Sequence, residues 1–157
     1  MSQHSATIRW TNTGPDFLKR RYSREHTIQF DGGTVVNGSP SPHVVPAPWS
    51  NAAAVDPEEA FVASVASCHM LWFLHVAIDS GFEALSYEDN ALGEMTKNER
   101  GKLWISRITL HPKIVWSGKR QPTADEVTQL HQRAHEECFI ANSIRTEVRI
   151  IDRGESY

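Results

Sequence analysis

The chain has 157 residues, a mass of 17.7 kDa and a formal net charge of -3. This length is sufficient for one hydrophobic core, and we expect a single domain over residues 1–157. The composition is that of a globular protein and lacks the basic excess of nucleic-acid binders, which excludes nucleic acid as an expected partner. The first residues resemble no secretory signal, so we expect a cytoplasmic protein whose thiols stay reduced.

Two β-rich runs are predicted near the N-terminus. Residues 7–10 and 22–30 are rich in β-branched, aromatic or alternating residues, and a turn-prone segment at 12–16 separates them. We expect the two runs to pair as strands and to end at the Asp-Gly-Gly sequence of 31–33. Residues 37–55 hold four of the eight prolines, which predicts a loop or an extended connection.

A long apolar helix is predicted from Asp56 to about Ser80. Asp56 is a good N-cap, Pro57 suits the first helical position, and Glu59 at the third position completes a capping box. Gly81 provides the expected stop.

The apolar part of this helix, residues 60–78, approaches the roughly 20 residues that cross a bilayer. However, Glu58, Glu59 and Asp79 flank it where a membrane span carries Lys or Arg, and two histidines within it would be costly in hydrocarbon. We therefore expect no membrane association. The helix should be buried by its own sheet or by a second subunit.

The C-terminal half is predicted to contain further strands around a second helix. Residues 87–95 are expected to form one strand, and 102–116 a long β-rich stretch with an irregularity at Pro112. A second capping box opens at Thr123, and its helix should run through His135 toward Cys138. Residues 145–151 alternate charged and apolar side chains, as an exposed strand does. The fold class is therefore α+β.

Two cysteines, Cys68 and Cys138, lie in distinctive surroundings. Cys68 lies inside Asp-Pro-Glu-Glu-Ala-Phe-Val-Ala-Ser-Val-Ala-Ser-Cys-His-Met, in the middle of the apolar helix, and Cys138 lies inside His-Glu-Glu-Cys-Phe-Ile-Ala-Asn-Ser, at the end of the second helix. A cysteine pair in a reducing compartment indicates catalysis, redox sensing or metal binding rather than a structural disulfide. Both segments resemble the signature segments of the OsmC/Ohr family, the osmotically inducible and organic hydroperoxide resistance proteins.

The resemblance implies antiparallel sheets wrapped around a long central helix and a second helix, in an intertwined homodimer with two sites at the subunit interface. It also implies a peroxidase that reduces organic hydroperoxides without a cofactor or a metal. Cys68 would attack the peroxide and become a sulfenic acid, and Cys138 would capture it as a disulfide. A dithiol reductant, such as a lipoyl-type or small-protein thiol, would then reset the enzyme.

The resemblance further implies an arginine beside the reactive thiol, held by a glutamate that opens the first helix. Glu58 occupies the place of that glutamate. It precedes Cys68 by ten residues, about 15 Å along a straight helix, so a bend or a second subunit must bring them together. Among Arg20, Arg21 and Arg24 we favour Arg24, because it begins a strand-like run while the other two belong to a basic, solvated run.

Substrate preference and reductant stay open. Four apolar neighbours of the first thiol would favour an alkyl or acyl hydroperoxide, although their helical spacing is more typical of a core: Phe61, Met70, Trp72 and Phe73. Phe139 follows the second cysteine where many relatives have proline, and the N-terminal hairpin is longer than in the hydroperoxide-resistance subfamily. The chain therefore resembles a general OsmC-like protein.

Three alternatives stay open at this point. His131, His135 and Cys138 share one helix face and could bind zinc, although no fourth ligand is apparent. Cys68 and His69 could form a nucleophilic pair for acyl transfer, although adjacent helical residues point about 100° apart. The chain could also be a non-catalytic protein that binds a small hydrophobic ligand in its dimer cavity.

Overall fold

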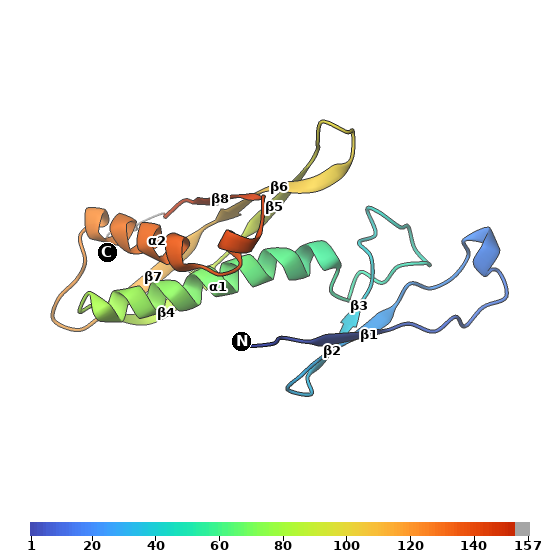
Figure 1. Ribbon diagram of the computed structural model, residues 1–157, viewed down its shortest axis with the longest axis horizontal. Helices are drawn as coiled ribbons and strands as arrows, with labels where there is room; N and C mark the ends of the chain where they lie inside the picture. Colours follow the sequence, from blue (N-terminus) through green and yellow to red (C-terminus); the bar gives the residue numbers. More distant parts are fainter. Residues whose placement is uncertain (153–157) are drawn as a thin grey trace. The chain divides into compact units, whose positions relative to one another are not determined.

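The computed structural model describes residues 1–152 and divides into two compact units, one covering Met1–Ala60 and one beginning at Phe61 (Figure 1). The first unit contains a three-stranded antiparallel sheet, in the order β1-β2-β3, and a short 3-10 helix. Their bounds are β1 (Ala6–Arg9), η1 (Phe17–Lys19), β2 (His26–Phe30) and β3 (Val35–Gly38). The expected N-terminal strand pair is confirmed as β1 and β2.

Two details of this sheet differ from the expectation. β2 begins at His26 and not at residue 22, because the Glu25 amide donates to Ser23 Oγ at 3.2 Å, a local bond that competes with strand pairing. The sheet also gains β3, which the proline-rich character of residues 37–55 obscured. Gly33, at φ 88°, closes the β2–β3 turn by donating its amide to the Phe30 carbonyl at 2.9 Å.

The long helix α1 (Pro57–Asp79) begins and ends as predicted. The Glu59 amide donates to Asp56 Oδ1 at 2.7 Å and the Asp56 amide donates to Glu59 Oε2 at 3.1 Å, which is a reciprocal capping box. At the other end Gly81 adopts φ 78°, and the Phe82 amide returns to the Ala77 carbonyl at 3.0 Å. Hydrogen bonds between residues close in the chain thus define both ends of α1.

The second unit adds five strands, a second α-helix and a 3-10 turn. Their bounds are β4 (Glu83–Asp89), β5 (Leu92–Lys97), β6 (Leu103–Leu110), β7 (Pro112–Ser117), α2 (Ala124–Glu137), η2 (Ala141–Ser143) and β8 (Glu147–Ile150). The single strand expected at 87–95 is wrong, because the chain breaks at Asn90. There Asp89 Oδ1 accepts the His111 amide at 2.7 Å, which fixes the corner between β4 and β5 to the corner between β6 and β7.

The five strands form two sheets. β4 pairs with β7 in an antiparallel manner, and the second sheet has the order β5-β6-β8. β5 and β6 are antiparallel, whereas β6 and β8 are parallel, so the expectation of antiparallel sheets holds for all pairs but this one. The parallel pair is possible because α2 lies between these strands in the chain and provides the long crossover that parallel strands need.

α1 packs against both sheets and against α2. One core cluster joins α1 and α2 to β4 and β7 through Phe73, Leu130 and Ala134. The other joins α1 to β6 through Val65, Ile108 and Leu110. These contacts cover part of α1 and leave the rest of its surface exposed.

The uncovered part of α1 includes two large apolar side chains. Leu71 is 60% exposed and Ile78 is 71% exposed. α1 is also long and apolar enough to cross a membrane by length and composition alone, a property that it shares with core helices of water-soluble proteins. We expected α1 to be buried on all sides, and this single chain buries one side of it.

Candidate active site

Cys138 lies where α2 stops. The helix starts at a capping box, in which the Glu126 amide donates to Thr123 Oγ1 at 3.2 Å and the Thr123 amide donates to Glu126 Oε2 at 2.9 Å. Cys138 is the C-cap, in an extended conformation, and its amide donates to the His135 carbonyl at 3.3 Å. The predicted helix from Thr123 toward Cys138 is confirmed.

The segment after Cys138 holds its thiol in a fixed, buried position. The side-chain amide of Asn142 donates to the Glu136 carbonyl at 2.7 Å and to the Cys138 carbonyl at 3.1 Å. The Ala141 amide points at Cys138 Sγ at 3.5 Å. The residue has no exposed surface, so the thiol meets only protein groups.

The Cys138 side chain lies beside that of Cys68 and interacts with it. Both cysteines are free. Burial raises the pKa of Cys138 to about 11, and the neighbouring Cys68 side chain adds to that increase. The structure thus brings together the two cysteines that the sequence singled out.

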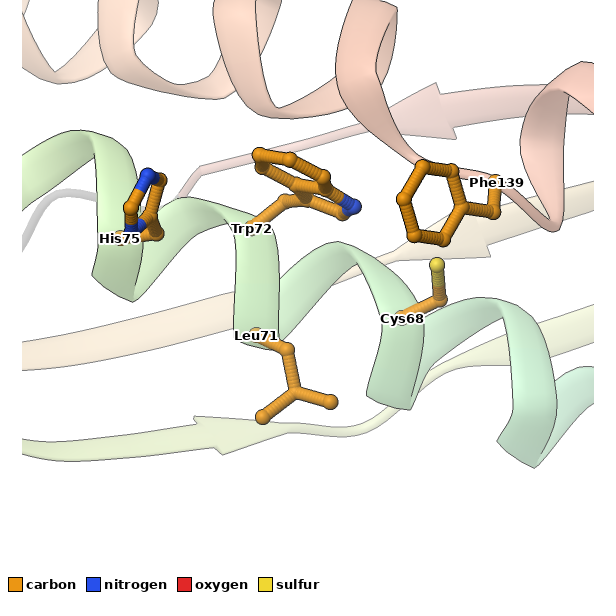
Figure 2. Close-up of a pocket in the computed structure, with 5 residues that line it drawn as sticks. All are labelled: Cys68, Leu71, Trp72, His75 and Phe139. Atoms are coloured by element: carbon orange, nitrogen blue, oxygen red, sulfur yellow. The ribbon is translucent and has the colours of Figure 1, made fainter. Parts of the chain in front are cut away.

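Cys68 also lines a pocket of about 280 Å³. The other lining residues are Leu71, Trp72, His75 and Phe139. In Figure 2 the Cys68 thiol points toward the Phe139 ring, and Trp72 and His75 follow along the same helix. The four α1 residues fall at positions i, i+3, i+4 and i+7, one face of a helix.

An aromatic pair forms the wall next to the thiol. The rings of Trp72 and Phe139 meet edge to face at 90°, with centroids 5.4 Å apart. Phe139 is 69% exposed and Cys68 is half-buried, so the pocket opens to solvent on this side. An apolar molecule can therefore reach Cys68, whereas Cys138 has no exposed surface and does not line the pocket.

Arg24 and Glu58 lie in the first unit. The Arg24 guanidinium packs over the Tyr22 ring at 4.1 Å and donates to the Tyr22 carbonyl at 3.1 Å. Arg24 is half-buried, whereas Arg20 and Arg21 are exposed, as expected of a basic run in solvent. Glu58 lies in the first turn of α1, where an acidic side chain interacts favourably with the positive end of the helix dipole.

The histidines beside the cysteines face elsewhere. His69 Nε2 lies 3.0 Å from His131 Nδ1, inside the core, so His69 is directed toward α2 and not toward the Cys68 thiol. The structure therefore gives no support to a Cys68–His69 nucleophilic pair. Within residues 1–152 no group of three metal-ligating side chains could hold a metal ion, so the alternative of a zinc site at His131, His135 and Cys138 finds no support.

Sequence reasoning found the thiols but only part of the pocket. Of the four apolar neighbours considered, Trp72 lines the pocket, while Phe73 is fully buried and Phe61 packs against the core. Leu71, His75 and the place of Phe139 in the wall were missed. The spacing i+3, i+4 and i+7 from Cys68 was the signal that could have identified the first two.

Comparisons with known proteins agree on one fold. The sequence profile of the OsmC-like protein family matches residues 50–151. An OsmC-like protein of unknown function from Vibrio cholerae is 48% identical, with 97% of this chain and 99% of that chain covered and a TM-score of 0.94. No protein in a search of curated sequences matches significantly.

More distant structures share the fold. An organic hydroperoxide resistance protein from Elizabethkingia anophelis is 20% identical, with 99% of this chain and 98% of that chain covered and a TM-score of 0.74. The organic hydroperoxide resistance protein OhrB of Bacillus subtilis is 21% identical, with 97% and 98% covered and a TM-score of 0.66. With its signature cysteine segments, its fold and the family match over residues 50–151, the chain belongs to the OsmC-like protein family.

Proposed function

We propose that this chain is a thiol-dependent peroxidase that reduces organic hydroperoxides through Cys68 and Cys138. The observation that carries the proposal is the proximity of the two cysteine side chains, at the edge of a pocket that is open to an apolar molecule. Two thiols in contact can form a disulfide without a large movement of either backbone, since bridging needs the two Cα atoms within about 7 Å.

The surroundings of the two thiols support different roles. Cys68 is the attacking thiol, because it lines the pocket and is half-buried, so a substrate can reach its sulfur. Cys138 is the resolving thiol. It is buried and its pKa is raised to about 11, so it stays protonated until a sulfenic acid forms beside it.

The cycle consumes two thiols for each peroxide. The Cys68 thiolate attacks the distal peroxide oxygen, an S–O bond forms and the O–O bond breaks, and the alkoxide leaves as an alcohol after taking a proton. The Cys138 sulfur then attacks the Cys68 sulfenic acid, an S–S bond forms, and the hydroxyl group leaves with the Cys138 proton as water. An external dithiol restores both thiols by exchange, which suits the reducing cytosol where we place the protein.

The pocket supports an organic hydroperoxide over hydrogen peroxide as substrate. Leu71, Trp72 and Phe139 give the space next to Cys68 an apolar lining, which stabilises an alkyl, aryl or acyl group by burying it. Structural relatives of this fold include proteins named for organic hydroperoxide resistance. The reductant, in our proposal a lipoyl-type or small-protein dithiol, would reach the disulfide through the same opening.

Arg24 and Glu58 complete the proposed site. A guanidinium beside the thiol would lower its pKa and stabilise the charge that develops on the peroxide oxygens, and Glu58 would orient it through a bidentate pair. Of the three candidate arginines, Arg24 is the half-buried one with a fixed direction, which supports its choice.

We also propose that the working unit is a homodimer. Leu71 and Ile78 leave an apolar strip on α1 that one chain does not cover, and a second copy would bury it. Sedimentation velocity at micromolar concentration should show a dimer. A Leu71→Glu/Ile78→Glu double variant should shift it toward monomer, and a wild-type monomer in that experiment would contradict this part of the proposal.

A turnover assay separates this function from passive ligand binding, the second function that an apolar pocket could serve. With dithiothreitol as electron donor, the protein should consume tert-butyl or cumene hydroperoxide catalytically and leave the corresponding alcohol. A protein that binds an apolar fluorescent probe in the pocket but consumes no hydroperoxide would be a binding protein, and the proposed activity would be wrong.

A further inference from the structure

Two histidines pair across the contact between α1 and α2, inside the core. His69 Nε2 and His131 Nδ1 are 3.0 Å apart, and the two rings stack with centroids 5.3 Å apart and an angle of 12°. The His131 ring also stacks on Phe73, with centroids 4.3 Å apart. His69 is 1% exposed and His131 is 4% exposed, so the bond is shielded from water.

The hydrogen bonding of this pair is incomplete. His69 Nδ1 and His131 Nε2 are buried and have no partner among the described residues. Whichever ring donates the bond between them, one of the two outer nitrogens carries an N–H without an acceptor. Leucine or phenylalanine would fill the space without that cost, so packing alone does not account for two imidazoles at this place.

The groups around the pair resist a positive charge. Burial lowers the pKa of His69 to about 4, helped by His135 on α2, and lowers the pKa of His131 to about 3, helped by His69. On β4, Tyr87 packs against Phe73 and is neutral because burial raises its pKa, and on β7 the neighbour is Trp116. Among the described residues, no carboxylate contributes to either histidine shift.

The pair ties together the segments that carry the two thiols. His69 directly follows Cys68 on α1, and His131 lies two helical turns before Cys138 on α2. The imidazole bond and the contact between the two cysteines thus lie between the same two segments. We propose that the His69–His131 hydrogen bond is a clasp that holds α2 on α1 and keeps Cys138 at Cys68, and that proton uptake by the pair releases it.

Proton uptake opens the clasp because water solvates an imidazolium cation, whereas the apolar core does not. A singly protonated pair could keep its bond but would bury a charge without a counter-ion, and a second proton would remove the acceptor. Both pKa values are depressed in the closed form, so the closed form is fully favoured above about pH 6.5 and is lost as the pH falls from there toward 4. If a histidine regains its ordinary pKa in the open form, its protonation at pH 5 raises the ratio of open to closed protein about thirtyfold.

These two histidines are positioning residues, and the release can be measured without peroxide. In a Cys68→Ser background Cys138 is the single thiol, and because it is fully buried its reaction with 4,4′-dithiodipyridine reports the opening. The reference is the same protein with His131→Asn, since an asparagine carboxamide reaches the position of Nδ1 and takes up no proton. Dividing the two rates at each pH removes the intrinsic pH dependence of the thiol.

We expect the ratio of the two rates to rise about thirtyfold between pH 7.5 and pH 5. The matched control is His135→Gln, which removes a histidine one turn further along α2 but not the clasp. Because burial is the larger cause of the lowered His69 pKa and His135 the smaller one, this variant should keep most of the rise seen in the parent. A ratio that does not change with pH overturns the clasp. If His131→Asn does not fold by circular dichroism, His69→Gln replaces it, because a glutamine carboxamide reaches the position of Nε2.

The role of the clasp in turnover rests on the proposed function, whereas the release itself does not. If the labelling ratio rises but no hydroperoxide is consumed at pH 7.5, the clasp stands and the peroxidase proposal fails. If hydroperoxide is consumed and the ratio stays flat, the peroxidase stands and the clasp fails. With both intact, disulfide formation after one equivalent of hydroperoxide should slow at pH 5 more in the parent than in His131→Asn.

Discussion

Cys68 and Cys138 differ in burial and in the groups that surround them. Cys68 is half-buried in the middle of a long helix and faces an apolar pocket, whereas Cys138 has no exposed surface and caps a shorter helix. Burial raises the pKa of Cys138 to about 11 and keeps this thiol protonated at neutral pH. In the proposed mechanism this difference assigns the roles: the pocket-facing Cys68 meets the substrate, and the buried Cys138 meets the sulfenic acid that forms on Cys68.

The largest expected effect comes from removing the exposed end of the pair. Cys68→Ser should abolish hydroperoxide consumption even in the first turnover, because the buried Cys138 cannot reach a substrate in the pocket. Single-turnover consumption, with enzyme in excess of cumene hydroperoxide, measures this directly. Rapid consumption by Cys68→Ser would show that Cys138 attacks peroxide, and it would reverse the roles assigned from the surroundings.

The Arg24→Ala change should affect Cys68 and leave the surroundings of Cys138 intact. Loss of a neighbouring cation raises a thiol pKa by one unit or more, so the first turnover should slow at least tenfold at neutral pH. The matched controls are Arg20→Ala and Arg21→Ala in the same segment, which should keep the rate of the parent. Full activity of Arg24→Ala with loss in either control would move the role to that residue.

A smaller effect should follow from changing the pocket wall alone. Phe139→Ala removes the ring that faces Trp72, and kcat/KM for cumene hydroperoxide should fall about tenfold relative to that for hydrogen peroxide, since an apolar contact is worth 1–3 kcal/mol in such discrimination. Leu85→Ala, at an exposed residue of β4 outside the pocket, is the control and should not alter the ratio. Equal losses for both substrates would show that Phe139 supports the site without selecting the substrate.

The sequence predicted best those features that depend on neighbours in the chain. Both α-helices carry capping boxes at their starts, at Asp56 and Thr123, and both were placed within two residues of their observed first turns. The cysteine segments were recognised for the same reason, because their signal lies within about fifteen consecutive residues.

Features that depend on distant contacts were missed. The break between β4 and β5 is fixed by the bond of Asp89 to the His111 amide, and the parallel pairing of β6 with β8 joins segments about forty residues apart. Periodicity cannot show that His69 meets His131 across two helices. It placed His131 on one helix face with His135 and Cys138, which raised zinc binding as an alternative. The pocket was found only in part, since Phe139, which forms one of its walls, comes from the segment after α2 and not from α1.

Mass spectrometry of the intact protein after one equivalent of an organic hydroperoxide tests the division of roles most directly. The parent should lose two hydrogens and yield a Cys68–Cys138 disulfide peptide, and Cys138→Ser should instead gain one oxygen at Cys68, trapped by dimedone as a sulfenic acid. A parent that gains oxygen and forms no disulfide, or a Cys138→Ser variant with unmodified Cys68, would contradict the account.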